Sequence, residues 1–293
     1  MKGRYVVLLS FLLFSLGSYA QVDLPVLMTE VSKGIKVAAN AQAKWSKVKT
    51  PKVVSSDSRM TLNKTASVTM YCNGIFKTLE GQGEYNLSDV FRDQIQATTT
   101  EWQKEFNTFL SAAGNSERSF GKKLPEDNGQ IKAISPMAGK LATFKIQFYW
   151  QADEEITDLQ LEITNADGKV MYTAEASGGV ALADPRKARL LPGRDYNWRV
   201  FSSSQPELTS DNKTFQMNTL GQKSQVLPGL KEDKSYQDTS PFIQSLMEAA
   251  WFESKEWYFD ADQSYRKLLK NMPDNPLSMQ FYQAFLNRCG AGE

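Results

Sequence analysis

Short stretches of alternating apolar and polar residues fill the chain between Val26 and Tyr85. In the stretch Ser-Val-Thr-Met-Tyr at 67–71, every second side chain falls on the same face, and Asn73-Gly74 separates this stretch from the next. Alternation with period two is typical of strands buried on one side, and an Asn-Gly pair between strands is typical of a type I′ hairpin. The pattern therefore predicts a small β-rich unit, a partly closed barrel or a sandwich, over residues 21–115.

The apolar spacing changes to steps of three and four residues after Leu87. Ser88 is placed to cap a helix, Asp89 lies in its first turn, and Gly114 is placed to stop it. We therefore predict one amphipathic helix over residues 88–113. Its polar face carries Gln and Glu rather than Lys and Arg, so packing on a sheet is favoured over binding at a membrane surface.

Two polar segments without periodicity divide the rest of the chain. Residues 116–129 contain Gly, Pro, Lys and acidic residues, and residues 221–239 contain Leu227-Pro228-Gly229 followed by a charged run. Segments of this composition are typical of connections between domains. We therefore predict linkers at 116–129 and 221–239.

Between these two segments the alternating pattern returns. Short alternating stretches carry large aromatic residues, among them Trp150 and Trp198. Pro192-Gly193 is a turn signal that directly precedes the alternating stretch from Tyr196 to Trp198 and beyond. Several short strands separated by turn signals predict an antiparallel β-sandwich over residues 130–220.

Helical spacing dominates residues 240–293. Ser240-Pro241 is a typical helix start, and prolines at 273 and 276 mark an interruption. The segment is predicted to form a helical hairpin or a three-helix tail. Three large aromatic residues of this segment stand out: Trp251, Trp257 and Tyr258. They form either the core of a small bundle or a groove that binds a partner.

The middle region resembles fibronectin type III and related immunoglobulin-like domains. Three features carry the resemblance: the motif Pro192-Gly193-x-x-Tyr196, the alternating pattern that continues to Trp198, and an earlier strand that ends at Trp150. In those families the tyrosine closes a corner by a hydrogen bond to the backbone, and the earlier tryptophan packs in the core. The resemblance implies these structural roles for Tyr196 and Trp150. It implies no activity, because such sandwiches carry many unrelated functions.

The first region is similar to the FecR-type β domain of bacterial envelope regulators. Trp45, the Asn-Gly turn at 73–74 and the stretch Gly-Gln-Gly-Glu-Tyr at 81–85 carry this resemblance. It implies a regulatory protein of the cell envelope. The regulators of that family are coupled to a membrane-spanning helix, whereas this chain has no apolar run of the length needed for one.

The last region resembles a single tetratricopeptide unit. Ser245 and Glu248 stand where that motif has Trp and Leu, and only one copy is visible. Such repeats need about three copies to bury a continuous core, so an isolated helical hairpin packed on the sandwich is an alternative. The register of small and aromatic residues that carries the resemblance is Ala249, Phe252, Tyr258, Ala261, Tyr265 and Pro273.

The first twenty residues have the pattern of a secretory signal. Lys2 and Arg4 precede an apolar run over 6–16, and Ser18-Tyr19-Ala20 offers small residues at the positions read by signal peptidase. The run is shorter than the roughly 20 apolar residues of a spanning helix, which makes an uncleaved anchor the lesser alternative. A signal peptide over residues 1–20 predicts export to the periplasm or beyond, with no membrane span left after cleavage.

Charge and residue counts exclude several function classes. The chain has 34 basic and 33 acidic residues, and loss of Lys2 and Arg4 with the signal leaves 32 against 33. A balanced chain argues against a nucleic-acid groove. The chain has no histidine, which removes Ser-His-Asp and Cys-His catalysis and His-ligated zinc. Its two cysteines, Cys72 and Cys289, are either a disulfide pair or free thiols, with a buried free thiol favoured at Cys72.

These observations predict no catalytic residue, metal ligand or cofactor. The adjacent carboxylates at 153–155 lie on a turn and point apart, so the alternative of a carboxylate-based hydrolase has little support. The predicted function is an exported, non-catalytic binding or scaffold protein of a bacterial cell envelope that acts through protein partners and not through nucleic acid. A FecR-type regulator without its own anchor is the second alternative. The oligomeric state is left open.

Overall fold

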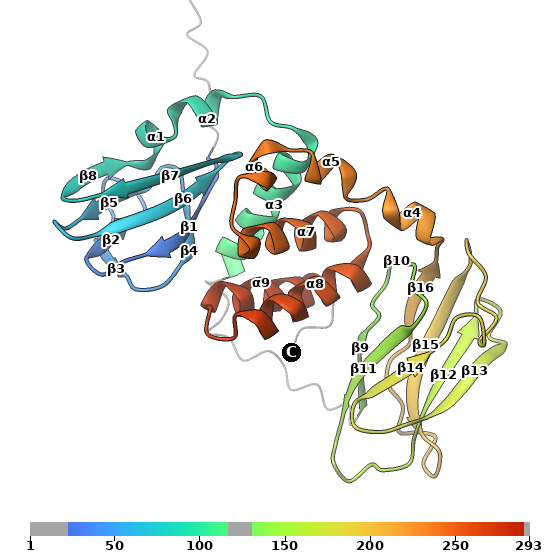
Figure 1. The fold of residues 1–293 in the computed structure, drawn as a ribbon. Coiled ribbons are helices and arrows are strands. Elements are labelled where there is room, and N and C mark those ends of the chain that lie inside the picture. Colours follow the sequence, from blue (N-terminus) through green and yellow to red (C-terminus); the bar gives the residue numbers. More distant parts are fainter. Residues whose placement is uncertain (1–22, 117–130, 290–293) are drawn as a thin grey trace, which may run out of the picture.

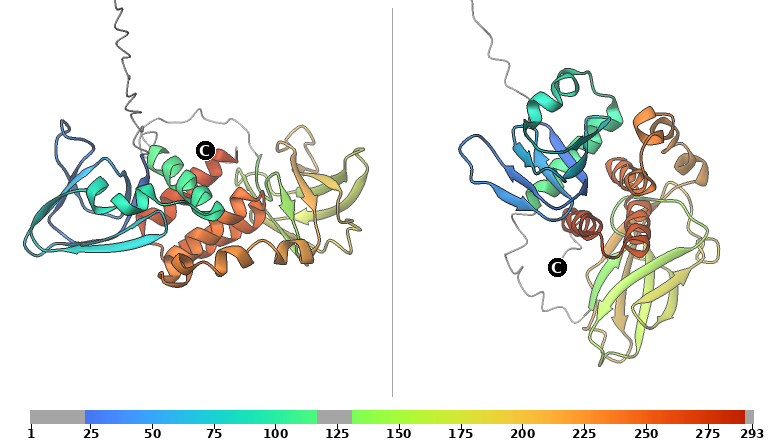
Figure 2. Two further views of the ribbon diagram at one scale, coloured as in Figure 1. Left: turned by 90° about the horizontal axis from the view of Figure 1, so that it is seen from above. Right: turned by 60° about the vertical axis from the view of Figure 1, so that its left-hand side comes forward.

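The computed structural model describes residues 23–116 and 131–289. The predicted signal peptide at 1–20 and all but the first residue of the predicted linker at 116–129 lie outside these ranges. Within them the chain is mainly β, with antiparallel sheets and a C-terminal helical region, as the pattern predicts. Two β units lie on opposite sides of a helical body (Figures 1 and 2).

The first β unit consists of eight strands: β1 (Pro25–Val31), β2 (Ile35–Ala38), β3 (Ser46–Val48), β4 (Lys52–Ser55), β5 (Arg59–Leu62), β6 (Ser67–Cys72), β7 (Ile75–Glu80) and β8 (Gly83–Asn86). They form two antiparallel sheets, ordered β4-β1-β6-β7 and β3-β2-β5-β8. Alternation buries one face of each sheet, so that Val68, Met70 and Cys72 of β6 are fully buried in the core of this unit.

The turn between β6 and β7 is the predicted Asn-Gly hairpin. Cys72 pairs with Ile75, and Asn73 and Gly74 both have positive φ, 44° and 91°, as a type I′ turn requires. The Asn73 side chain also donates to the carbonyl of Gln94 at 2.7 Å and accepts from Asn107 at 3.1 Å. The tip of the hairpin therefore holds the helices that follow.

The prediction of a single helix over 88–113 is wrong. The segment forms α1 (Leu87–Val90), α2 (Arg92–Gln96) and α3 (Glu101–Ser116), and Asn86 rather than Ser88 is the N-cap residue of α1. Three consecutive threonines at 98–100 separate α2 from α3. Their β-branched side chains disfavour helix, and Thr100 exchanges hydrogen bonds with Gln103 to start α3 anew.

The apolar stripe of this segment is divided between two cores. Leu87 and Phe91 are buried in the first β unit, whereas Trp102, Phe106 and Phe109 are buried in the helical body. A single straight helix could not place its apolar residues in both. The break between α2 and α3 therefore links the first β unit to the rest of the molecule.

The second β unit is an antiparallel sandwich, as predicted. Its strands are β9 (Ile131–Ser135), β10 (Lys140–Leu141), β11 (Ile146–Ala152), β12 (Leu159–Asn165), β13 (Val170–Ala176), β14 (Val180–Ala183), β15 (Asp195–Ser202) and β16 (Lys213–Met217). One sheet has the order β14-β11-β9 and the other β10-β16-β15-β12-β13, with the short β10 parallel to β16. Phe148, Trp198 and Phe215 from the two sheets meet in the core.

The prediction of a linker at 221–239 is wrong. The segment holds α4 (Leu220–Ser224), α5 (Pro228–Lys231) and α6 (Lys234–Gln237). Thr219 and Gln222 form a capping box that starts α4, and Leu230 is completely buried. Asp233 caps α6 and accepts a 2.6 Å hydrogen bond from the indole N–H of Trp102. The polar residues of this segment therefore serve as caps and not as a free connection.

Three longer helices complete the chain: α7 (Pro241–Ser254), α8 (Tyr258–Asn271) and α9 (Pro276–Arg288). Of the two forms predicted for residues 240–293, the three-helix form is therefore observed. Ser240 caps α7, as predicted. These helices and α3 share one hydrophobic core, which also includes Leu27 and Tyr71 of the first β unit. No helix in the described ranges is long and apolar enough to cross a membrane.

Candidate functional site

The sandwich meets the helical body at the turn between β9 and β10. The backbone N–H of Lys140 donates to the carbonyl of Glu256 at 2.7 Å. The Lys140 ammonium lies 3.1 Å from the Glu256 carboxylate and donates to the carbonyl of Lys255 at 3.2 Å. Both partners belong to the loop between α7 and α8, so one lysine joins the two bodies by its backbone and by its side chain.

Gly139 is required at this contact. Its φ is +113°, which L-residues rarely adopt, and a Cβ atom added there would lie 2.4 Å from the Glu256 carbonyl oxygen and 2.6 Å from the Tyr258 ring. A second contact joins the same bodies where the Arg266 guanidinium lies over the Tyr149 ring, 3.9 Å from its centroid. The Arg266 side chain is held there by both carboxylate oxygens of the fully buried Asp262.

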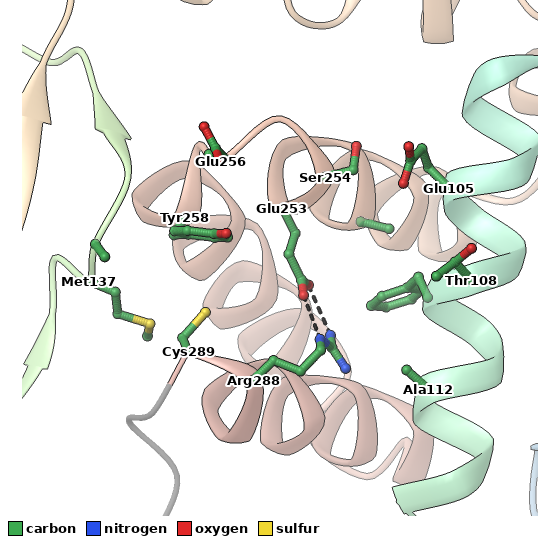
Figure 3. Close-up of a pocket in the computed structure, with 13 residues that line it drawn as sticks. Glu105, Thr108, Ala112, Met137, Glu253, Ser254, Glu256, Tyr258, Arg288 and Cys289 are labelled. Carbon is green, nitrogen blue, oxygen red and sulfur yellow. Dashed lines mark hydrogen bonds and ion pairs between the residues drawn. The ribbon is translucent and has the colours of Figure 1, made fainter.

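A hollow of about 560 Å³ lies beside this contact, and we call it the junction hollow. Helices α3, α7 and α9, the start of α8 and the β9–β10 turn all contribute to its wall (Figure 3). The residues that line it are Glu105, Thr108, Phe109, Ala112, Met137, Ala138, Ala250, Glu253, Ser254, Glu256, Tyr258, Arg288 and Cys289.

Apolar side chains form much of the wall, and they are held firmly. Phe109 stacks on Phe281 with ring centroids 4.9 Å apart, and Met137 and Ala250 are almost completely buried. Because these groups belong to the main core of the helical body, the hollow is formed before any ligand arrives.

The charged groups of the hollow are mostly neutralised by partners. Glu253 receives two hydrogen bonds from the Arg288 guanidinium, at 2.6 and 2.9 Å, and this ion pair crosses the middle of the hollow (Figure 3). Glu256 is paired with Lys140. The carboxylate of Glu105, on α3, has no ion pair or hydrogen bond with any residue in the described ranges. One uncompensated carboxylate therefore remains on the wall.

The two weak acids in the hollow keep their protons at neutral pH. Burial, and secondarily the charge of Glu253, raises the pKa of the Cys289 thiol to about 12. Burial, with Cys289 and nearby glutamates, also raises the pKa of the Tyr258 hydroxyl. A protonated thiol is a poor nucleophile. Cys289 and the fully buried Cys72 are both free cysteines, so the disulfide alternative is not observed.

The three C-terminal aromatic residues singled out from the sequence lie in different surroundings. Trp257 is only 4% exposed and belongs to the core. Trp251 is half-buried, donates its indole N–H to the Val226 carbonyl at 2.5 Å, and lines a second hollow of about 420 Å³ on the other side of the α7–α8 loop. Tyr258 lines the junction hollow. Trp257 also lines that second hollow, so Trp251 and Trp257 share one hollow and Tyr258 lies in the other.

The aromatic residues predicted in the sandwich lie in its core. Leu191 N–H donates to the hydroxyl oxygen of Tyr196 at 2.8 Å, the corner contact that the resemblance implies. Trp198 donates its indole N–H to the Pro136 carbonyl at 2.8 Å. Trp150 is 3% exposed, in the core that the same resemblance implies. Gly193, which follows Pro192, has φ +76°, as expected of a tight turn, and its N–H donates to the Met217 carbonyl of β16.

Sequence reasoning named Tyr258 and Cys289 but missed most of the residues that form the junction hollow. Met137 lies in a turn with no recognisable motif, and Glu105 and Arg288 are ordinary polar positions on amphipathic helices. Gly139 is a local signal that could have indicated this contact, because an isolated glycine between strands often marks a close approach of two backbones.

No protein-family model matches the chain, and no curated protein matches it. Among solved structures, it is similar to the adhesin domain of Epf from Streptococcus pyogenes, with 6% identity over 67% of each chain and a TM-score of 0.24. It is similar to the BSP domain of a biofilm associated protein, with 11% identity over 69% of this chain and 26% of that one, at a TM-score of 0.22. It is also similar to the fibronectin(III)-like modules of Clostridium thermocellum CbhA, with 7% identity over 68% of this chain and 87% of that one, at a TM-score of 0.22. At these TM-scores the similarities assign neither fold nor function.

Proposed function

We propose that the protein is an exported, non-catalytic binding or scaffold protein of a bacterial cell envelope, and that it holds a protein partner in the junction hollow. The observation that carries the proposal is the chemistry of the wall. Glu253 is neutralised by Arg288 and also accepts from the Tyr265 hydroxyl, the Cys289 thiol is protonated, and Phe109 and Met137 offer apolar surface. Such a wall suits the binding of a side chain better than a reaction.

The position of the hollow supports a scaffold role. Its wall combines the β9–β10 turn of the sandwich with α3, α7 and α9 of the helical body. A segment bound there would contact both bodies at once, so binding would strengthen their mutual orientation. The N-terminal pattern of Lys2, Arg4 and the apolar run at 6–16 supports export.

Site-specific photo-crosslinking in the native bacterium tests this function. A photoreactive residue at Thr108, an exposed position on the wall, should capture a discrete partner protein. The same residue at Thr173, exposed on β13 at the outer edge of the sandwich, is the matched control and should capture none. Equal capture at the two positions, or no capture at Thr108, would contradict binding at the hollow.

Cell fractionation tests the compartment in the same strain. The protein should be recovered from the periplasm or the medium, with Gln21 at its N-terminus. Recovery from the cytoplasm with Met1 still present would refute export.

A further inference from the structure

The polar atoms on the α3 side of the junction hollow are all hydrogen-bond acceptors. Thr108 commits its hydroxyl proton to the carbonyl of Lys104 at 3.0 Å, and Ser254 commits its own to the carbonyl of Trp251 at 2.9 Å. Each hydroxyl oxygen therefore presents only lone pairs to a ligand. Glu105, which lies opposite Ser254 in Figure 3, adds a carboxylate.

The net charge of the wall, like its acceptor atoms, favours a positively charged hydrogen-bond donor. Arg288 in the wall is paired with Glu253, Glu256 in the wall is paired with Lys140, and Glu105 has no such partner in the part of the chain that the structure describes. The wall is left with one negative charge. A bound anion would be repelled by it, a neutral donor would leave its charge uncompensated, and a cation with N–H donors would both neutralise it and donate to it.

Apolar surface continues directly from these acceptors. Phe109 and Ala112 follow Thr108 along α3, and Ala250 and Met137 face them from α7 and the β9–β10 turn. A lysine side chain matches this arrangement, because it has a long apolar stem and an ammonium with three donors and no acceptor. The whole hollow has a volume of about 560 Å³, which leaves room for an apolar neighbour of that lysine.

We infer that the junction hollow is a docking site for a partner polypeptide that inserts a lysine next to an apolar residue, with the ammonium on Glu105, Thr108 and Ser254. This inference rests on the proposed function, since it specifies the partner that the hollow would hold. A charge-assisted contact of this kind changes affinity by about tenfold.

Selection from a displayed library of random peptides tests the inference without a known partner. On the full chain, the recovered peptides should be enriched in lysine beside an apolar residue. The enrichment should disappear on Glu105→Gln, which keeps the size of the side chain and removes its charge. It should persist on Glu175→Gln, which removes an exposed charge from β13.

A second variant and a peptide pair complete the test. Thr108→Lys, at an exposed position, places a competing ammonium beside Glu105 and should also abolish selection. A recovered peptide whose lysine is replaced by norleucine should bind about tenfold more weakly. Thermal melts of all variants should coincide with that of the parent chain, which separates loss of binding from loss of folding.

Three outcomes would overturn the inference: no lysine enrichment, equal enrichment on Glu105→Gln, or competition by N-acetyl-lysine amide as strong as that of the whole peptide. The last outcome would indicate a site for free amines. If crosslinking from Thr108 still captures a partner in the Glu105→Gln background, the proposed function stands and the lysine assignment fails. Absence of any captured partner, with lysine selection intact, would refute the proposed function and leave the ligand chemistry supported.

Discussion

Gly139→Ala is the most direct perturbation of the contact between the sandwich and the helical body. The added methyl group would lie 2.4 Å from the carbonyl oxygen of Glu256, a backbone atom that cannot swing away as a side chain can. The φ of +113° adds a conformational cost of about 1–2 kcal/mol for any L-residue. Relief of the clash requires the β9–β10 turn to move away from the α7–α8 loop.

That movement also breaks the hydrogen bond from Lys140 N–H to Glu256, which contributes about 1 kcal/mol. We therefore expect Gly139→Ala to lower the free energy of unfolding by roughly 2–4 kcal/mol. Gly168→Ala is the matched control. Gly168 has a positive φ of +78° in the β12–β13 turn, and nothing lies within 4 Å of its added Cβ, so this substitution should cost only about 1–2 kcal/mol.

Urea unfolding followed by tryptophan fluorescence measures both effects. Trp198 reports on the sandwich and Trp102 on the helical body. Single-tryptophan versions of the parent chain should show coincident transitions, whereas Gly139→Ala should separate them, because the sandwich no longer docks on the α7–α8 loop. A Gly139→Ala chain with coincident transitions and no greater loss of stability than Gly168→Ala would refute the assigned role of Gly139.

Three other predictions test separate parts of the structure. Tyr196→Phe removes the acceptor of Leu191 N–H and should cost about 1–2 kcal/mol in urea unfolding. Tyr172→Phe removes a half-buried hydroxyl that has no hydrogen bond to any described residue, and the corner assignment is wrong if this control costs as much. Leu230→Ala should cost about 2–4 kcal/mol because Leu230 is fully buried, whereas Leu191→Ala, at a residue 61% exposed, should cost little; equal costs would restore the linker interpretation of 221–239. The pKa of Cys289, raised from 9.0 to about 12, means that the folded state retains a proton that the unfolded state loses above pH 9, so stability falls as pH rises from 9 towards 12. Alkylation of Cys289 at pH 9, followed by mass spectrometry, should be roughly five hundredfold slower in the folded chain than in urea, and equal rates would contradict the burial of the thiol.

Several elements could be predicted from local patterns because each depends on neighbours in sequence. The Asn73-Gly74 hairpin needs only two residues that tolerate positive φ between alternating strands. The sandwich follows from short alternating stretches with turn residues, and the Tyr196 corner closes over five residues. Ser240-Pro241 starts α7 for the same local reason.

The errors lie where distant contacts outweigh local preference. The apolar stripe after Leu87 has helical spacing throughout, yet Phe91 packs in one core and Trp102 in another, and periodicity cannot report which core a residue joins. The polar residues at 221–239 resemble a linker by composition. Their function as caps depends on the packing of Leu230 and on the bond from Trp102 to Asp233, 131 residues apart.

The amino-acid sequence alone thus determined the local structure of this protein, namely its strands, its principal turns and its C-terminal helices. It also excluded chemistry that needs histidine, because the chain has none. The junction hollow is of another kind, because Glu105, Met137, Ser254 and Arg288 come from four separate segments and none belongs to a motif. Whether a glutamate is paired or free, and whether a thiol keeps its proton, depends on neighbours that only the folded chain brings near. The proposed binding chemistry is therefore a property of tertiary contacts, and the close approach of Gly139 to Glu256 is one of the contacts that hold the β9–β10 turn against the helical body.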